Sequence, residues 1–262
     1  MKLIITPEPK KITHFLYKIV AIVILIGLLT SFAKNIFNLP GNSAIVRFFN
    51  LNGEANIPSL YSASAIWFCS ALIWFIYKEE KKLQNKGAAF WKWLCFVFIF
   101  LGFDELLAIH EKTKSIAIFF SNYIQLPKMY LYWTILYGIL LLFFAIYFFR
   151  FYFSLKKITR IRFTIAGIVF VGGAVGMEIL GGLYEKKILG GGLYDTQVGF
   201  EAFGMGIIIA IEEGMEMVGI VLFIRALLYH ICTLNSYPVL IIDFKIKSKS
   251  EHKNQLQRTL ER

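Results

Sequence analysis

Residues 198–229 read VGFEAFGMGIIIAIEEGMEMVGIVLFIRALLY, an apolar run longer than the roughly 20 residues with which a helix crosses a bilayer. Glu201, Glu212, Glu213 and Glu216 interrupt this run, and Arg225 is its only basic residue. An ionised carboxylate in hydrocarbon is costly unless it is protonated, paired or coordinated. The stretch therefore predicts a transmembrane helix that carries a functional acidic site.

Further blocks of the chain also reach spanning length. Of the 262 residues, 57% are hydrophobic, and the mean hydropathy of +0.62 is too high for a water-soluble domain of this size. The first block also resembles a signal peptide, because three lysines precede it and small residues end it, but it is long enough to span. We expect an all-α fold, a polytopic bundle of six transmembrane helices, in which residues 13–33, 59–77, 90–110, 129–150 and 161–183 precede the helix at 198–229.

The positions of Lys and Arg along the chain, whose formal net charge is +11, set its predicted orientation. Lys and Arg fall in short runs at the N-terminus, at every second connection and in the tail, and such runs face the cytoplasm. This pattern does not favour nucleic-acid binding, because no basic face is interleaved with the apolar blocks. We expect a multi-pass protein of the inner (plasma) membrane with both termini in the cytoplasm, a transmembrane domain over 1–233, and a basic cytoplasmic tail over 234–262.

The connections on the other side have distinct characters. NLNGEANIPS, in the connection 34–58, predicts an ordered turn. The segment 112–128 is apolar but too short to span, which favours the membrane interface. Three consecutive glycines in KKILGGGLYD allow a tight turn. In the tail, the alternation in VLIIDFKIKSKS predicts a short strand.

Depth and helical periodicity predict that the acids converge. At about 1.5 Å per residue, the acids of the third, fifth and sixth helices fall mainly in the outer half of the bilayer. At about 100° per residue, Asp104 and Glu111 share one face, and Glu201, Glu212 and Glu216 share another. We also expect Gly172 and Gly176 to form a small-residue packing face that brings Glu178 against a neighbouring helix.

Carboxylates and one imidazole at one depth suit a divalent metal, namely Zn, Mn or Fe. In an enzyme, Glu105 and Glu216 are the candidate catalytic residues, with the metal activating water or oxygen toward a lipid-like or amphiphilic substrate. Glu54 and Glu201 are candidates for support at the outer side. The predicted metal ligands are Asp104, Glu105, His110, Glu111, Glu178, Glu212 and Glu216.

Two other functions fit the same acids. A proton- or cation-coupled transporter would bind and release its ion, or a cationic small ligand, at buried carboxylates. A membrane scaffold would use them only to stabilise a wet cavity. The four histidines are too few for a histidine-rich metal cluster, and the three cysteines share no metal-binding spacing.

The runs NGEANIP (52–58), DELLAIHE (104–111) and EEGMEMVG (212–219) resemble a family of bacterial multi-pass membrane proteins of uncharacterised function. This resemblance covers most of the helical region and leaves out the tail. It implies a six-helix membrane protein and draws attention to Glu54 and to the acids and histidine of the second run. It implies no particular reaction.

Overall fold

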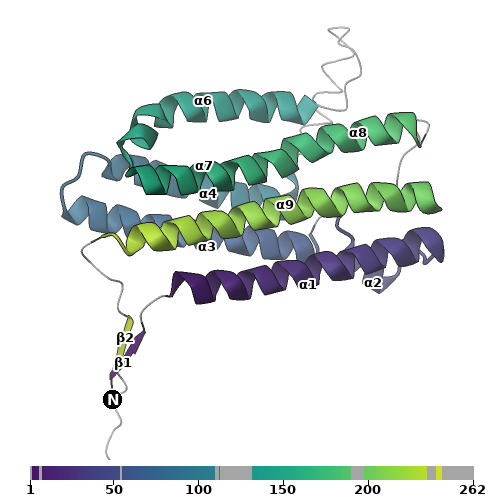
Figure 1. Ribbon diagram of the computed structural model, residues 1–262, viewed down its shortest axis with the longest axis horizontal. Coiled ribbons are helices and arrows are strands. Elements are labelled where there is room, and N and C mark those ends of the chain that lie inside the picture. Colours follow the sequence, from purple (N-terminus) through teal and green to yellow (C-terminus); the bar gives the residue numbers. More distant parts are fainter. Residues whose placement is uncertain are drawn as a thin grey trace, which may run out of the picture.

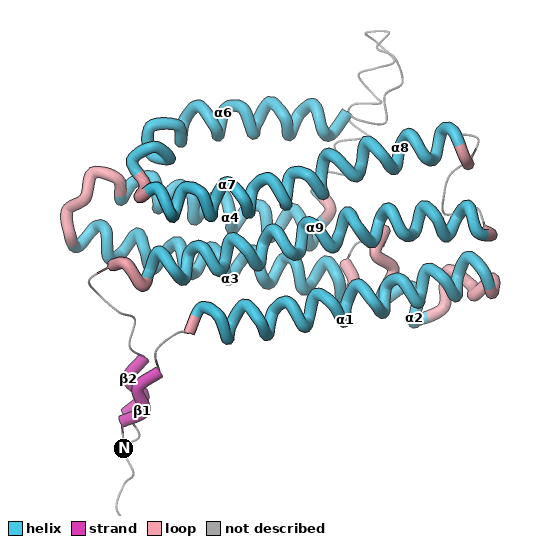
Figure 2. The backbone as a smooth tube through the Cα atoms, in the orientation of Figure 1, coloured by secondary structure: helices cyan, strands magenta, loops and turns pink. Residues whose placement is uncertain are grey.

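The computed structural model describes most of the chain as long helices that lie side by side, with a two-stranded sheet at one end (Figures 1 and 2). The described residues are 2–5, 8–53, 55–109, 112, 132–189, 198–234 and 240–243.

Within the described residues there are six long helical rods, and each overlaps one of the predicted blocks. The fifth rod is continuous but changes its hydrogen-bonding pattern twice, from α-helix to π-helix and back. The rods are α1 (Pro9–Ile36), α3 (Ile57–Lys82), α4 (Ala88–Leu107), α6 (Tyr132–Ser154), the fifth rod formed by α7 (Lys157–Val171), η1 (Gly172–Met177) and α8 (Glu178–Lys187), and α9 (Phe200–Ile231).

The ends of the rods differ from the predicted blocks for two reasons. Several rods run past the apolar residues because backbone hydrogen bonding continues into the polar flanks, as where α3 ends at Lys82. The third rod is shorter than predicted, because α4 ends at Leu107 and not at residue 110. Ala108 follows with a left-handed backbone, at a φ of +50°, and its N–H donates to the Asp104 carbonyl. A non-glycine residue in this conformation stops an α-helix.

The connection before α3 is an ordered turn, as predicted. The Asn56 side chain accepts a hydrogen bond from the Ser59 backbone N–H at 3.1 Å, and Ser59 Oγ accepts one from the Asn56 N–H at 2.9 Å. This reciprocal capping box starts α3. Asn56 Nδ2 also donates to the carbonyls of Asn50 and Gly53. The same connection contains a short helix, α2 (Ala44–Phe49), which the sequence did not indicate.

The last long helix, α9, lies at the centre of the packing. It contacts α1, α3 and the fifth rod along much of its length. Its C-terminal half joins the main apolar core through Ile224 and Leu227, which are fully buried and cluster with Trp91 of α4 and Ile73 of α3. The acids of α9 therefore lie on a helix that packs against several others.

The two chain ends meet in a small antiparallel sheet. Strand β1 (Lys2–Ile5) pairs with β2 (Leu240–Asp243), with Lys2 opposite Asp243 and Ile5 opposite Leu240. The strand predicted in the tail is therefore confirmed, and its partner is the N-terminal segment. Both lie beyond the end of the bundle at which α1 begins and α9 ends (Figure 1).

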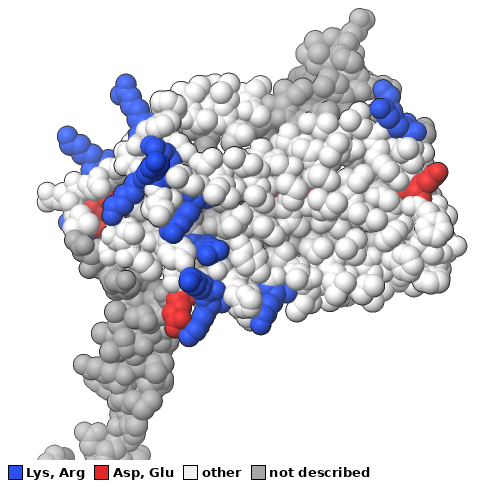
Figure 3. Space-filling view, in the orientation of Figure 1, with Lys and Arg blue, Asp and Glu red and all other residues white. Residues whose placement is uncertain are grey.

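The described helices have the length and surface of a membrane protein. Three of them are long and apolar enough to cross a bilayer, namely Pro9–Ile36, Ile57–Lys82 and Lys157–Lys187. Large apolar side chains point outward along the bundle, as at Phe143 and Ile168, each 67% exposed. Figure 3 shows most of the visible Lys and Arg at the end where α1 begins, and an uncharged band between the two ends.

Candidate functional site

Carboxylates from three helices gather around Glu216 of α9. The charge of Glu216 interacts with those of Glu212 and Glu213 on the same helix, with Glu105 on α4 and with Glu178 at the start of α8. We call these five residues the carboxylate cluster. All five side chains are partly buried. The structure thus brings together four of the predicted metal ligands, Glu105, Glu178, Glu212 and Glu216, from helices far apart in the sequence.

Close packing at Gly173 holds the fifth rod against α9 beside the cluster. A Cβ atom at Gly173 would lie 2.9 Å from the backbone oxygen of Glu212 and 3.1 Å from Cγ of Glu216. Only glycine leaves room for this approach. The predicted face of Gly172 and Gly176 is wrong in part, because nothing lies within 4 Å of a Cβ at Gly176.

The π-helical segment η1 explains why Gly173, and not the predicted Gly176, packs against α9. In a π-helix the backbone bonds run from residue i to i+5, so side chains rotate relative to an α-helix. This segment covers Gly172–Met177 and ends immediately before Glu178. It therefore turns Gly173 toward α9 and sets the direction from which Glu178 enters the cluster.

Asp104 and Glu105 end the third rod. Asp104 and Glu105 are consecutive residues in the last turn of α4. Asp104 is 6% exposed, and Glu105 is partly buried. The predicted shared face of Asp104 and Glu111 required one continuous helix, whereas α4 ends at Leu107 and Ala108 follows with a left-handed backbone. His110, Glu111 and Glu54 lie outside the described residues.

Glu201 lies away from the carboxylate cluster. It is exposed in the first turn of α9, eleven residues before Glu212, which corresponds to about 16 Å along the helix axis. The Tyr184 hydroxyl donates to its backbone carbonyl at 3.1 Å. The predicted inward face therefore includes Glu212 and Glu216 but does not extend to Glu201.

Metal ligation is not assembled in the part of the chain that the structure describes. Among those residues, no group of three or more His, Cys, Asp and Glu side chains is arranged to hold a metal ion. The cluster is therefore an electrostatic assembly of acids from three helices. Its described members supply oxygen donors only, which suit hard cations and protons.

Sequence reasoning gave no role to His230, which is buried where α9 ends. Its ring stacks on Trp91, with ring centroids 5.0 Å apart, and its Nδ1 lies 3.4 Å from the Thr159 hydroxyl. Its Nε2 is buried without a hydrogen-bond partner in the described structure. A buried histidine between three helices indicates a packing role. No pattern in the sequence distinguished His230 from a histidine at the membrane interface.

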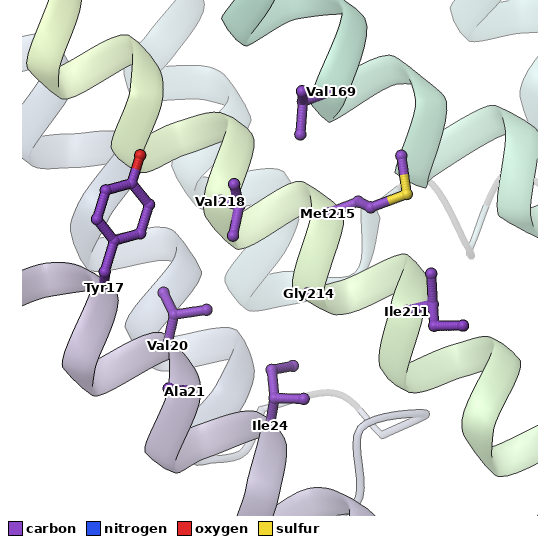
Figure 4. Close-up of a pocket in the computed structure, with 9 residues that line it drawn as sticks. All are labelled: Tyr17, Val20, Ala21, Ile24, Val169, Ile211, Gly214, Met215 and Val218. Atoms are coloured by element: carbon purple, nitrogen blue, oxygen red, sulfur yellow. The ribbon is translucent and has the colours of Figure 1, made fainter.

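A groove of about 400 Å³ between α1, α7 and α9 was also missed. Figure 4 shows its lining, which is apolar except for the hydroxyl of Tyr17. On α9 the groove is lined by Ile211, Gly214, Met215 and Val218. At 100° per residue these are centred about 130° around α9 from Glu212 and Glu216, on a different face of the helix. Such a groove depends on the relative placement of three helices, which no local sequence signal reports.

Comparison with known proteins gives one match. A family model described as a domain of unknown function, DUF8692, matches residues 17–231. The matched region runs from the first turns of α1 to the last residue of α9, so it contains the whole carboxylate cluster and excludes both strands. Neither a curated protein nor a solved structure matches the chain significantly.

Proposed function

Because the chain belongs to the DUF8692 family, a domain of unknown function, we propose its function from its own geometry: it is a multi-pass membrane protein whose carboxylate cluster binds a cation, in the first place a divalent metal ion. One observation carries this proposal. Three helices bring Glu105, Glu178 and the α9 acids into electrostatic contact with Glu216.

Electrostatics favours a bound cation at this place. Like charges repel more strongly as the surroundings become less polar, and two unit charges 4 Å apart interact by about 4 kcal/mol at an effective dielectric constant of 20. A divalent cation among the carboxylates replaces this repulsion with attraction. Protons are the alternative source of positive charge, and they would reduce the same repulsion by neutralising individual acids.

The proposed topology has six membrane crossings and both termini in the cytoplasm of a bacterial cell. It is supported by the six long rods and by the basic residues at the end of the bundle where α1 begins. The pairing of β1 with β2 also supports it, because it keeps the two ends of the chain on one side. The carboxylate cluster then lies within the membrane domain, toward the outer half.

The proposed metal is Zn, Mn or Fe, with Asp104, His110 and Glu111 completing the ligand set around the cluster. In an enzyme of this kind, Glu216 or Glu105 would act as the general base toward water activated by the metal, and the substrate would be lipid-like. Both candidate catalytic residues belong to the cluster, on different helices.

Cation- or proton-coupled transport is a second candidate, and the π-helical segment favours it. A helix interrupted within the membrane beside its ion-binding acids is a recurrent feature of secondary transporters. Here η1 separates α7 from α8 directly before Glu178 and packs against α9 at Gly173. A change of η1 from π-helical to α-helical bonding would rotate Glu178 relative to Glu216.

Elemental analysis of the protein purified in mild detergent without chelator tests the proposal. The comparison is between the wild type, Glu216→Gln and the control Glu201→Gln, which is exposed and outside the cluster. Near-stoichiometric metal that is lost only in Glu216→Gln supports metal binding. Ion-dependent flux in vesicles that Glu216→Gln abolishes, without bound metal, supports transport. Neither metal nor flux, or equal behaviour of the two variants, refutes a cation site at Glu216.

A further inference from the structure

We propose that the groove between α1, α7 and α9 binds an anionic phospholipid, with an acyl chain in the groove and the phosphate near Arg162 and Arg225. On α9, this site is centred about 130° around the helix from Glu212 and Glu216. It requires the protein to lie in a membrane, and it does not depend on cation binding at Glu216.

The groove has the shape and lining of a chain-binding site. On α9, residues spaced by three and four line it from Ile211 to Val218, over about 10 Å. On α1, Tyr17 and Ile24 lie seven residues apart along a parallel stripe. The groove opens to the apolar surface, since Ile211 is 47% exposed. In a bilayer, such a surface is in contact with lipid tails.

Positive charge lies at one end of this groove. Arg225 comes seven residues after the groove residue Val218, and Arg162 comes seven residues before the groove residue Val169. Seven residues are nearly two helical turns, so each arginine continues the groove-lining stripe of its helix. Because α7 and α9 run in opposite directions, both arginines fall at the same end, which is the basic end of the bundle (Figures 1 and 3).

Contacts between the helices draw these arginines together. The guanidinium carbon of Arg162 lies 4.1 Å from the centroid of the Tyr229 ring, and that of Arg225 lies 5.8 Å from the same ring. Arg225 also interacts electrostatically with Tyr17, whose ring extends from α1 toward α9 at this end of the groove (Figure 4). Both arginines are partly buried. Two guanidinium groups thus lie beyond the end of the apolar groove that carries the Tyr17 hydroxyl.

Charge complementarity selects the occupant. Guanidinium groups bind phosphate oxygens with two parallel hydrogen bonds, and basic residues near the membrane surface attract anionic lipids. An apolar groove that ends at two arginines matches a molecule with a hydrocarbon chain and a negatively charged phosphate. A neutral phospholipid would fill the groove without using the arginines, and a second copy of this chain would have to place an acidic group there.

Native mass spectrometry of the full-length protein in detergent tests this inference. Phosphatidylglycerol and phosphatidylcholine with identical chains are added in equal amounts. The wild type is expected to bind one phosphatidylglycerol in preference to phosphatidylcholine. The pair Arg162→Gln and Arg225→Gln is expected to weaken phosphatidylglycerol binding about 30-fold, at about fivefold to sixfold for each charge. Arg160→Gln is the matched control, because this partly buried arginine of the same helix lies over the rings of Tyr152 and Phe153; it is expected to leave the lipid preference unchanged.

Two further variants keep the test decisive if the double glutamine variant does not fold. Gly214→Leu puts a side chain into the groove, where the nearest atom to its Cβ would be Ile24 at 3.8 Å, and is expected to abolish binding of both lipids. Arg162→Lys with Arg225→Lys is expected to retain the preference for phosphatidylglycerol. Equal binding of the two lipids by the wild type overturns the proposal. The proposal is also overturned if the wild type forms a lipid-free dimer and Gly214→Leu dissociates it, because a second copy of the chain then occupies the groove.

Discussion

Gly173→Ala is expected to destabilise the bundle, because the added methyl group has no room between η1 and α9. Its Cβ would lie 2.9 Å from the Glu212 carbonyl oxygen, 3.0 Å from Met215 Cβ and 3.1 Å from Glu216 Cγ. The first of these atoms belongs to the backbone and moves only with α9. Overpacking of this kind costs about 1–3 kcal/mol. For a chain of this size that corresponds to a melting temperature lower by about 3–10 °C.

Gly176→Ala is the matched control, three residues further along the same π-helical segment. Nothing lies within 4 Å of a Cβ at Gly176, and alanine favours helical backbone over glycine by up to about 1 kcal/mol. The assay is thermal unfolding in detergent, monitored through tryptophan fluorescence. We expect the melting temperature to fall in Gly173→Ala and to stay level or rise in Gly176→Ala. Equal melting temperatures for the two variants would refute the argument that Gly173 sets the approach of η1 to α9.

Two further predictions concern single side chains. Asn56→Ala removes the cap of α3 and two hydrogen bonds to loop carbonyls, so denaturant unfolding should show a loss of about 1–3 kcal/mol, and an unchanged midpoint would count against the capping box. In metal-free protein, Glu216→Gln should raise the free energy of unfolding by on the order of 1 kcal/mol, because it relieves the repulsion among the clustered carboxylates. Glu201→Gln should leave it unchanged. Equal melting temperatures of the two variants in thermal unfolding would argue against the cluster.

The existence of the helices was the most predictable part of the fold. Each of the six rods overlaps an apolar run of about 20 residues or more that the sequence analysis had identified. Their ends were less predictable, since polar flanks extend some helices and Ala108 stops another. Glycine is the usual signal for a left-handed residue, and alanine at this position gave no warning.

The carboxylate cluster was predictable in outline, because the depth of an acid follows from helix direction and rise per residue. Glu105, Glu178 and Glu212 were expected at similar depth in the outer half of the bilayer, and the structure brings all three to Glu216. The packing face was not predictable in detail. Whether Gly172–Met177 forms α- or π-helical bonds depends on the neighbouring helix, so the sequence indicated Gly176 where Gly173 makes the contact.

Glu201 and the groove show two other limits of the sequence. The helical wheel gave Glu201 the correct angle for an inward face, but a helix that begins at Phe200 leaves its first turn exposed. The groove lies between three helices, and its lining residues resemble other apolar side chains when each helix is considered alone.

The central claim is tested most directly by titrating metal-free protein with Mn²⁺. The electron paramagnetic resonance signal of the free ion measures how much Mn²⁺ the protein binds. Cation binding by the carboxylate cluster predicts one site per protein in the wild type, lost in Glu216→Gln and retained in Glu201→Gln. Binding that is equal in all three proteins would contradict the claim, as would the absence of any protein-bound Mn²⁺ in the wild type.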